Sequence, residues 1–254
     1  MAKLSGKHAL VTGGGSGIGA AIALNLALDG ANVTISGRRQ QPLEALSARH
    51  PNINLVTADI TNPHSVAEMF EAAQNTTGPV DIIVANAGVA QSASLAKTDL
   101  SLWNEMISVN LTGTFLTLKE AAKHMIDVDW GRMITIASTA GIKGSSYISA
   151  YSAAKHGVVG LTRSLAIEYA GKGITVNAVC PGFTQTPIVE STIANIMEKT
   201  GLDEQKARNA LTKNNPMGRI IQPEEVASAV NWLVGPGSEG VTGQTISVCG
   251  GETW

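Results

Sequence analysis

Short apolar runs alternate with helical patterns along this chain of 254 residues, and this alternation constrains the fold more than any other feature. It is typical of a parallel sheet covered on both faces by crossover helices. Right-handed crossovers then give a doubly wound α/β fold of the Rossmann type, with ligands at the carboxyl ends of the strands. We expect a seven-stranded sheet, with strands at His8–Thr12, Asn32–Ser36, Asn54–Thr57, Asp81–Ala85, Arg132–Ser138, Thr175–Val179 and Thr245–Val248.

One stretch breaks the alternation. From Pro187 to about Pro223 the pattern is helical without a strand. Because this stretch follows the sixth strand, we expect it to overhang the ligand cleft as a substrate lid, at about residues 187–223. With no internal repeat or second boundary, residues 1–254 are predicted to form a single dinucleotide-binding catalytic domain.

Composition excludes several classes of partner. The net charge is −2, which argues against nucleic acid or an anionic membrane surface as the partner. Cys180 and Cys249 form no C-x-x-C pair, so we expect buried free thiols in a reducing compartment and no metal site. The start of the chain has no apolar signal region, and no run approaches the length of a membrane span. A cytoplasmic enzyme acting on a small molecule is expected.

A glycine-rich loop, Thr12-Gly13-Gly14-Gly15-Ser16-Gly17-Ile18-Gly19, follows the first expected strand. Glycines allow a pyrophosphate to approach the backbone, and the next helix offers unpaired N–H groups and a favourable dipole. Glycine loops are common, but one placed between the first strand and an amphipathic helix predicts a dinucleotide site.

The segment Tyr151-Ser152-Ala153-Ala154-Lys155 indicates the chemistry. Positions four apart share a helix face, so Tyr151 and Lys155 are expected side by side. An ammonium beside a phenol favours the phenolate, which predicts a lowered tyrosine pKa and an acid-base group. The hydroxyl of Ser138 is then expected to hold the substrate oxygen. His156 is rejected as a base, because adjacent helix positions point to different faces.

These motifs resemble those of the short-chain dehydrogenase/reductase family from Lys7 to Gly251. They are Thr12–Gly19, Asn86-Ala87-Gly88, Asn110, Ser138, Tyr151 with Lys155, and Pro181-Gly182 followed by Thr186. One position departs from many relatives, because Ala85 stands where they have an asparagine.

The resemblance implies hydride transfer between a nicotinamide and a carbonyl or alcohol carbon. Tyr151 would be the proton donor or acceptor, Lys155 would bind the nicotinamide ribose, and Ser138 would polarise the carbonyl. Asn110 would hold a water that links Lys155 to solvent. The cofactor-binding residues that it implies are Gly13, Ser16, Gly17, Ile18, Gly19, Asp59, Ile60, Asn86, Gly88, Tyr151, Lys155, Pro181, Gly182, Thr184 and Thr186. The family also implies a homotetramer.

Three of these residues have structural alternatives. Asn110 could be an ordinary helix residue, and Ser138 could be a turn serine that ends the fifth strand. Asp59 could cap the helix that begins near Asn62, since aspartate is a good capping residue.

The end of the second expected strand bears on the choice of cofactor. An acid normally binds the ribose hydroxyls of NAD there. This chain has Gly37 followed by Arg38 and Arg39, and a guanidinium suits a 2′-phosphate. We therefore expect NADP(H), although Ser16 is not the basic residue that some NADP-dependent relatives carry, and NAD(H) is the alternative.

Three functions remain open. The segment Val234–Gly251 resembles bacterial ketoreductases, which favours an NADP(H)-dependent reductase of a 3-oxoacyl thioester or similar ketone. An NAD-dependent catabolic secondary-alcohol dehydrogenase is the second candidate, and a catalytically silent nucleotide-binding protein is the third. The expected lid has an excess of cations that could attract an anionic substrate handle: Lys199, Lys206, Arg208, Lys213 and Arg219, against Glu198, Asp203 and Glu204.

Overall fold

The structure is a computed structural model that describes residues 3–125 and 129–253. Seven parallel strands form one sheet in the order β3-β2-β1-β4-β5-β6-β7, which confirms the doubly wound α/β prediction. From β1 the strand order runs outward to β3 on one side and, beginning with β4, outward to β7 on the other side. Such folds bind ligands at this switch point between β1 and β4. The strands are β1 (His8–Thr12), β2 (Asn32–Gly37), β3 (Ile53–Thr57), β4 (Ile82–Ala85), β5 (Gly131–Ile136), β6 (Ile174–Pro181) and β7 (Thr245–Val248).

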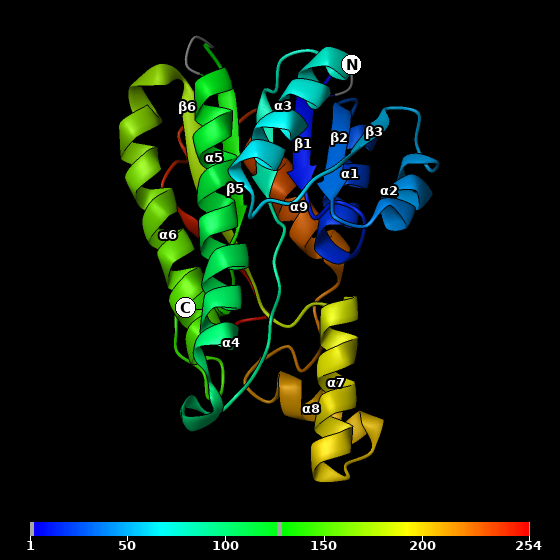
Figure 1. Cartoon of the computed structure of the whole chain (residues 1–254), viewed down its shortest axis with the longest axis vertical. Helices are drawn as coiled ribbons and strands as arrows, with labels where there is room; N and C mark the ends of the chain where they lie inside the picture. The colour runs from blue at the N-terminus through cyan, green and yellow to red at the C-terminus, as the bar shows by residue number, and fades with distance from the viewer. Residues whose placement is uncertain (1–2, 126–128, 254) are drawn as a thin grey trace.

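Two layers of helices cover the sheet (Figure 1). One face packs on α1 (Gly17–Leu28), α2 (Gln40–Ser47) and α9 (Pro223–Val234), and the other packs on α3 (Pro63–Thr77), α5 (Gly113–His124) and α6 (Ser149–Tyr169).

Side chains alternate between the two faces along each strand. Ala9 and Val11 of β1 join the first core, whereas Leu10 joins the second. Phe70 and Leu26 are fully buried, and burial of such a side chain stabilises the fold by roughly 1.5–3 kcal/mol.

The fifth strand is shorter than predicted. β5 ends at Ile136, because Ser138 adopts an extended conformation and caps a short 3₁₀ turn (Thr139–Gly141). The hydroxyl of Ser138 accepts from the backbone N–H of Ala140 at 3.1 Å. Ser138 is therefore a turn serine, as the structural alternative held, and it also faces the site described below.

The helical stretch between β6 and α9 projects beyond the carboxyl end of the sheet as α7 (Pro187–Thr200) and α8 (Glu204–Thr212) (Figure 1). As predicted, no strand lies in this stretch of the described chain, although Ile221 forms an isolated bridge with Thr184. The two helices share a small core of their own: Val189, Ile193, Ala207 and Ile220.

Both cysteines are buried and free, as predicted. Burial raises the pKa of the Cys180 thiol to about 11, so this thiol is protonated at neutral pH. Within residues 3–125 and 129–253, no helix is long and apolar enough to cross a membrane.

Candidate active site

The glycine loop between β1 and α1 is pressed against the segment that follows β4. Gly13 has a φ of 65°, and a Cβ there would lie 2.8 Å from the Cα of Ala87. A Cβ on Gly19 would overlap the carbonyl oxygen of Gly13 and the side-chain nitrogen of Asn86. Both positions therefore require glycine for close backbone approach.

The side chains of Asn86 and Thr12 fix this loop by hydrogen bonds. The amide of Asn86 donates to the backbone carbonyls of Thr12 and Gly13 at 2.8 and 3.2 Å. The hydroxyl of Thr12 accepts from the backbone N–H groups of Asn86 and Ala87 at 3.0 and 3.1 Å. Asn86, which the sequence assigns to the cofactor, thus also fixes the shape of the loop that would contact it.

The loop leads into the N-terminus of α1. Ser16 is exposed at the N-cap, and within the described chain its hydroxyl makes no capping hydrogen bond. Ile18 turns inward and packs on the first core. A Cβ on Gly17 would lie 3.0 Å from Cγ2 of Thr186, so the turn before α7 closes over the start of α1. Backbone N–H groups and a hydroxyl converge here, as an anion site requires.

Threonine hydroxyls shape the turn after β6. Pro181 ends the strand, and Gly182 donates its N–H to the carbonyl of Val248 at 3.0 Å. Thr184 donates its hydroxyl to the carbonyl of Gly182 at 3.0 Å, and Thr186 donates to the carbonyl of Thr184 at 3.1 Å. These bonds explain how residues from the end of β6 reach the glycine loop.

Tyr151 and Lys155 lie on one face of α6, as their spacing predicts. Lys155 is 4% exposed, and its Nζ lies 5.7 Å from the centroid of the Tyr151 ring. The Nζ donates to the carbonyl of Ile136, at the end of β5, at 2.8 Å. Burial lowers the pKa of Lys155 to about 8, since desolvation disfavours the ammonium.

The predicted direction of the Tyr151 pKa is wrong for the protein alone. Burial raises the pKa of Tyr151 above its usual value, and interaction with the Ser138 side chain opposes this without reversing it. Burial also lowers the pKa of the neighbouring Lys155, so its side chain carries a positive charge over a narrower pH range than the sequence spacing suggests.

Asn110 lies at the centre of a π-helical turn (Ser108–Thr112) that joins α4 (Leu100–Ile107) to α5. It is fully buried within this turn. Its amide donates to the carbonyls of Val89 and Met106 at 2.9 and 3.0 Å, and its oxygen accepts from the N–H of Val89 at 3.2 Å.

Gly88 lies against both Asn110 and Lys155. A Cβ on Gly88 would lie 2.8 Å from the Asn110 oxygen and 3.6 Å from the Lys155 Nζ. The structure therefore brings Gly88, Asn110 and Lys155 together from three separate segments.

Asp59 and the two arginines border the other end of the glycine loop. Asp59 does not cap α3, because Asn62 accepts from the N–H groups of His64 and Ser65 instead. The Asp59 carboxylate accepts from the N–H and the hydroxyl of Thr61 at 2.9 and 2.8 Å. These bonds lower the pKa of Asp59, with a smaller contribution from the charge of Arg38.

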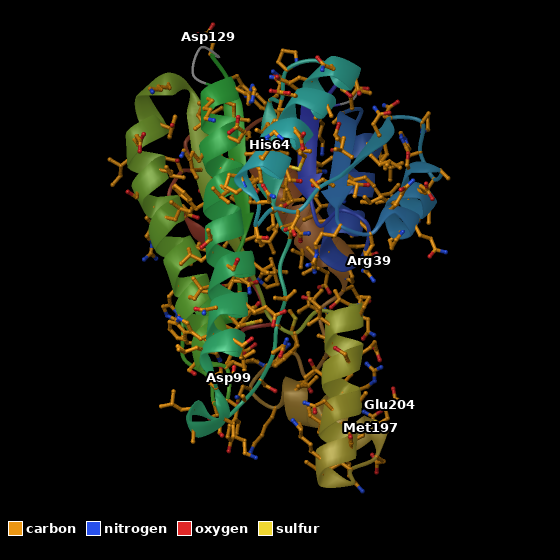
Figure 2. The ribbon with its side chains drawn as sticks, viewed as in Figure 1. Arg39, His64, Asp99, Asp129, Met197 and Glu204 are labelled. Atoms are coloured by element: carbon orange, nitrogen blue, oxygen red, sulfur yellow. The ribbon has the colours of Figure 1, made fainter. Side chains whose placement is uncertain are left out.

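Arg38 and Arg39 are exposed just after β2. In the view of Figure 2, Arg39 lies on the side of the domain from which α7 projects. The neighbouring Ile60 is buried, and a Cβ on Gly113 would lie 2.5 Å from its Cδ1, so Ile60 is fixed against the start of α5. His156 is exposed, as expected from its position on the opposite face of α6.

Comparisons with known proteins give one family. A family model described as enoyl-(acyl carrier protein) reductase matches residues 13–253. The chain belongs to the short-chain dehydrogenase/reductase family.

Individual members of the family match over nearly their full length. A Streptomyces coelicolor protein named as a candidate ketoacyl reductase is 38% identical over 99% of this chain and 98% of its own. A D-beta-hydroxybutyrate dehydrogenase of Rhizobium meliloti is 37% identical over 97% and 98%. The crystal structure of an actinorhodin polyketide ketoreductase variant with NADPH has a TM-score of 0.94, with 37% identity over 99% of each chain.

Most cations of the segment at residues 187–223 form ion pairs with nearby carboxylates. Arg208 pairs with Glu190 and Glu204, each at 2.9 Å, and Lys206 pairs with Asp203 at 3.0 Å. Arg219 pairs with Glu225 at 2.6 Å. Among the described residues, Lys199 and Lys213 are the cations of this segment that lack an ion-pair partner, so most of the cations in the predicted modest excess are already paired.

Sequence reasoning missed two parts of this site. One is the backbone carbonyl of Ile136, which holds the Lys155 ammonium. The other is Val89, whose backbone holds Asn110. Backbone groups carry no residue-type signal, so only the fold could reveal them.

Proposed function

We propose that this protein is an NADP(H)-dependent ketoreductase that reduces a 3-oxoacyl thioester or a similar ketone. One observation carries the proposal: Ser138, Tyr151 and a fully desolvated Lys155 converge at the carboxyl end of β5, beside the glycine loop. A buried lysine beside a half-buried tyrosine, both with perturbed pKa values and next to an anion-binding loop, is the arrangement that acid-base catalysis needs.

The residues fit a dinucleotide. Glycine at positions 13 and 19 lets the loop pack closely against itself and the segment after β4, and the N-terminus of α1 offers backbone N–H groups for a pyrophosphate. When bound, the nicotinamide supplies a hydride to the carbonyl carbon.

The protein side chains manage the oxygen of the substrate. Ser138 donates a hydrogen bond to the carbonyl oxygen and orients it toward Tyr151. Tyr151 then delivers its proton to that oxygen as negative charge develops there. Lys155, held by the carbonyl of Ile136, stabilises the resulting phenolate and binds the ribose, and Asn110 keeps the segment after β4 in place beside it.

Arg38 and Arg39 support the choice of NADP(H). Both are exposed where β2 ends, and Gly37 provides no carboxylate to repel a 2′-phosphate. Among the described residues neither guanidinium forms an ion pair, so both are available for a phosphate.

One relative favours a second candidate. The match to a D-beta-hydroxybutyrate dehydrogenase is nearly as high as the match to the ketoacyl reductase relative, which supports an NAD-dependent secondary-alcohol dehydrogenase as the second candidate.

We also propose a cytoplasmic homotetramer. Large apolar side chains are exposed on α4, α5, α6 and α9, where a second copy would cover them: Trp103, Phe115, Ile167 and Trp232. Light scattering of the purified protein tests the assembly.

The function is tested by following nicotinamide absorbance with NADPH or NADH against acetoacetyl thioesters and simple ketones. We expect a preference for NADPH. Arg38→Asp should reduce kcat/KM with NADPH by about tenfold or more, because it removes a charge-assisted hydrogen bond and places an acid near the phosphate. Equal efficiency of the wild type with both cofactors, or a preference for NADH, would promote the alcohol dehydrogenase.

A further inference from the structure

A shallow polar cleft, wide open to solvent, lies between the loop that follows Ser138 and the end of α8. Its volume is about 630 Å³, and it is lined by Lys143, Gly144, Ser145, Ser146 and Asn214. The loop segment Lys143–Ser146 connects the 3₁₀ turn capped by Ser138 to the helix that carries Tyr151. A ligand in this cleft would therefore contact the loop between Ser138 and Tyr151, two residues of the proposed site.

An ion pair fixes one wall of the cleft. The Lys143 Nζ lies 3.0 Å from Oε1 of Glu252 and donates to the Glu252 carbonyl at 3.2 Å. The Glu252 side chain is 10% exposed, and the Lys143 side chain is 33% exposed. A Cβ on Gly182 would lie 3.1 Å from Oε2 of Glu252. The carboxylate thus lies between Lys143 and the turn that is expected to contact the cofactor.

The C-terminal tail that carries Glu252 is itself anchored to the base of the α7–α8 segment. Gly250 and Gly251 are packed so closely on Asn215 and Pro216 that a Cβ on either would contact them. Met217 donates its N–H to the carbonyl of Gly250 at 3.2 Å. The tail therefore connects three segments around the cleft and holds the Lys143 ammonium in one place.

The charges at the cleft cancel. Lys143 brings one positive charge and Glu252 one negative charge, so the pair carries no net charge. An ammonium has three N–H groups, and Glu252 uses two of them. The third N–H remains for a ligand, together with the hydroxyls of Ser145 and Ser146 and the amide of Asn214.

We propose that this cleft binds the far end of the substrate and selects an uncharged hydrogen-bond acceptor, such as an amide or ester carbonyl. Lys143 is the specificity-determining residue, and Glu252 is a positioning residue that orients Lys143 and cancels its charge. The proposal rests on the ketoreductase function above and names the substrate class at that site: ketones with a neutral, polar handle.

Other handles fit less well. An alkyl handle would leave the donors of the cleft without partners, which costs binding free energy. A carboxylate handle would gain from Lys143 but would be repelled by the paired Glu252 carboxylate.

The test compares three acetoacetyl thioesters of matched length, whose far ends are an acetamide, an alkyl chain and a carboxylate. With wild-type enzyme and NADPH, kcat/KM should be about two- to tenfold higher for the acetamide than for the alkyl thioester, the range expected for one hydrogen bond. Equal values for these two thioesters would overturn the proposal.

Variants separate the two members of the pair. Lys143→Met should abolish the preference for the acetamide by raising the KM of that thioester, and Lys143→Arg should retain the preference.

Glu252→Gln leaves an uncompensated ammonium, so it should raise kcat/KM for the carboxylate thioester by about three- to tenfold and leave the acetamide value nearly unchanged. Lys123→Met, which removes a lysine paired with Glu120 on the surface of α5, is the matched control and should change no preference. An unchanged carboxylate preference in Glu252→Gln, or a retained acetamide preference in Lys143→Met, would contradict the assignment.

Calorimetry with NADP⁺ and the same three thioesters separates failure of this inference from failure of the proposed function. Binding does not require turnover. If none of the thioesters is reduced with either cofactor, the ketoreductase function fails, and the binding preference still decides the role of Lys143. If all are reduced but bind equally, the function stands and the cleft is not a selective subsite.

Discussion

The catalytic region and the projecting α7–α8 segment are held in place by different interactions. In the first, buried hydrogen bonds lock each part: Asn86 on the glycine loop, Asn110 on Val89, and Lys155 on the carbonyl of Ile136. In the second, a core of four buried side chains and several exposed ion pairs connect two helices that extend beyond the sheet.

This difference teaches how one fold separates reaction from selection. Buried hydrogen bonds in a low dielectric are costly to break, so the reacting groups stay in position. Exposed ion pairs contribute little to stability, so the projecting segment is held mainly by its small apolar core. Figure 2 shows Met197 and Glu204 on this segment, away from the packed layers.

The largest effect should come from the buried lysine. Lys155→Ala should reduce kcat by about a hundredfold or more and also weaken NADPH binding, because it removes both the charge beside Tyr151 and a ribose contact. Turnover and calorimetric titration with NADPH measure the two losses. Normal cofactor affinity in this variant would remove Lys155 from the ribose site.

The same variant should change the pH dependence of stability. The pKa of Lys155 is lowered to about 8 from an unfolded value of 10.5, so unfolding takes up a proton between these pH values. The free energy of unfolding is therefore highest above pH 10.5, where Lys155 is neutral in both states. It decreases by about 3 kcal/mol in total as the pH falls from 10.5 to 8. Denaturant titrations of wild type and Lys155→Ala from pH 7 to 10.5 should therefore differ in slope, and parallel curves would contradict the buried position of the ammonium.

A smaller effect is expected at the glycine loop. Gly19→Ala places a Cβ against the Gly13 carbonyl and the Asn86 amide, so it should destabilise the fold by about 1–3 kcal/mol and weaken NADPH binding. Gly160→Ala is the control, because nothing lies within 4 Å of its Cβ position on α6, and it should stabilise the protein by about 0.4–1 kcal/mol. Thermal unfolding of both variants, with and without NADPH, makes the comparison. Similar melting temperatures for the two variants would show that the loop tolerates a side chain.

Ile193→Ala should have the smallest effect on global stability, and its comparison with Leu26→Ala distinguishes the two regions most clearly. Ile193→Ala removes a side chain from the small core of α7 and α8, and Leu26→Ala removes one of similar size from the main core. Leu26→Ala should destabilise the whole domain by about 2–5 kcal/mol, whereas Ile193→Ala should loosen its segment locally and raise the substrate KM severalfold. Global unfolding and limited proteolysis measure these outcomes. Equal loss of global stability in both variants would mean that the segment folds as one unit with the sheet.

Sequence patterns predicted most of the sheet because strands buried on both faces are continuous apolar runs. The expected His8–Thr12 and Thr245–Val248 match β1 and β7 at both ends. The end of the fifth strand was wrong by two residues, since Ser138 uses its hydroxyl to begin a turn.

Long-range pairing and burial lay beyond sequence reasoning. Arg208 pairs with Glu190 across 18 positions, so a charge count over residues 198–219 overestimated the unpaired cations of the projecting segment. Lys143 pairs with Glu252 across 109 positions, a contact that only the fold creates. The spacing of Tyr151 and Lys155 showed that they are neighbours, but not that both are desolvated, which reversed the expected direction of the tyrosine pKa.

The central claim is that Tyr151 delivers the proton in an NADPH-dependent ketone reduction. The most direct measurement is the turnover of Tyr151→Phe with an acetoacetyl thioester, together with the dissociation constant of NADPH. We expect Tyr151→Phe to lose roughly a hundredfold or more in kcat with nearly unchanged NADPH affinity, because only the proton-transferring hydroxyl is removed. Near wild-type turnover in this variant would contradict it.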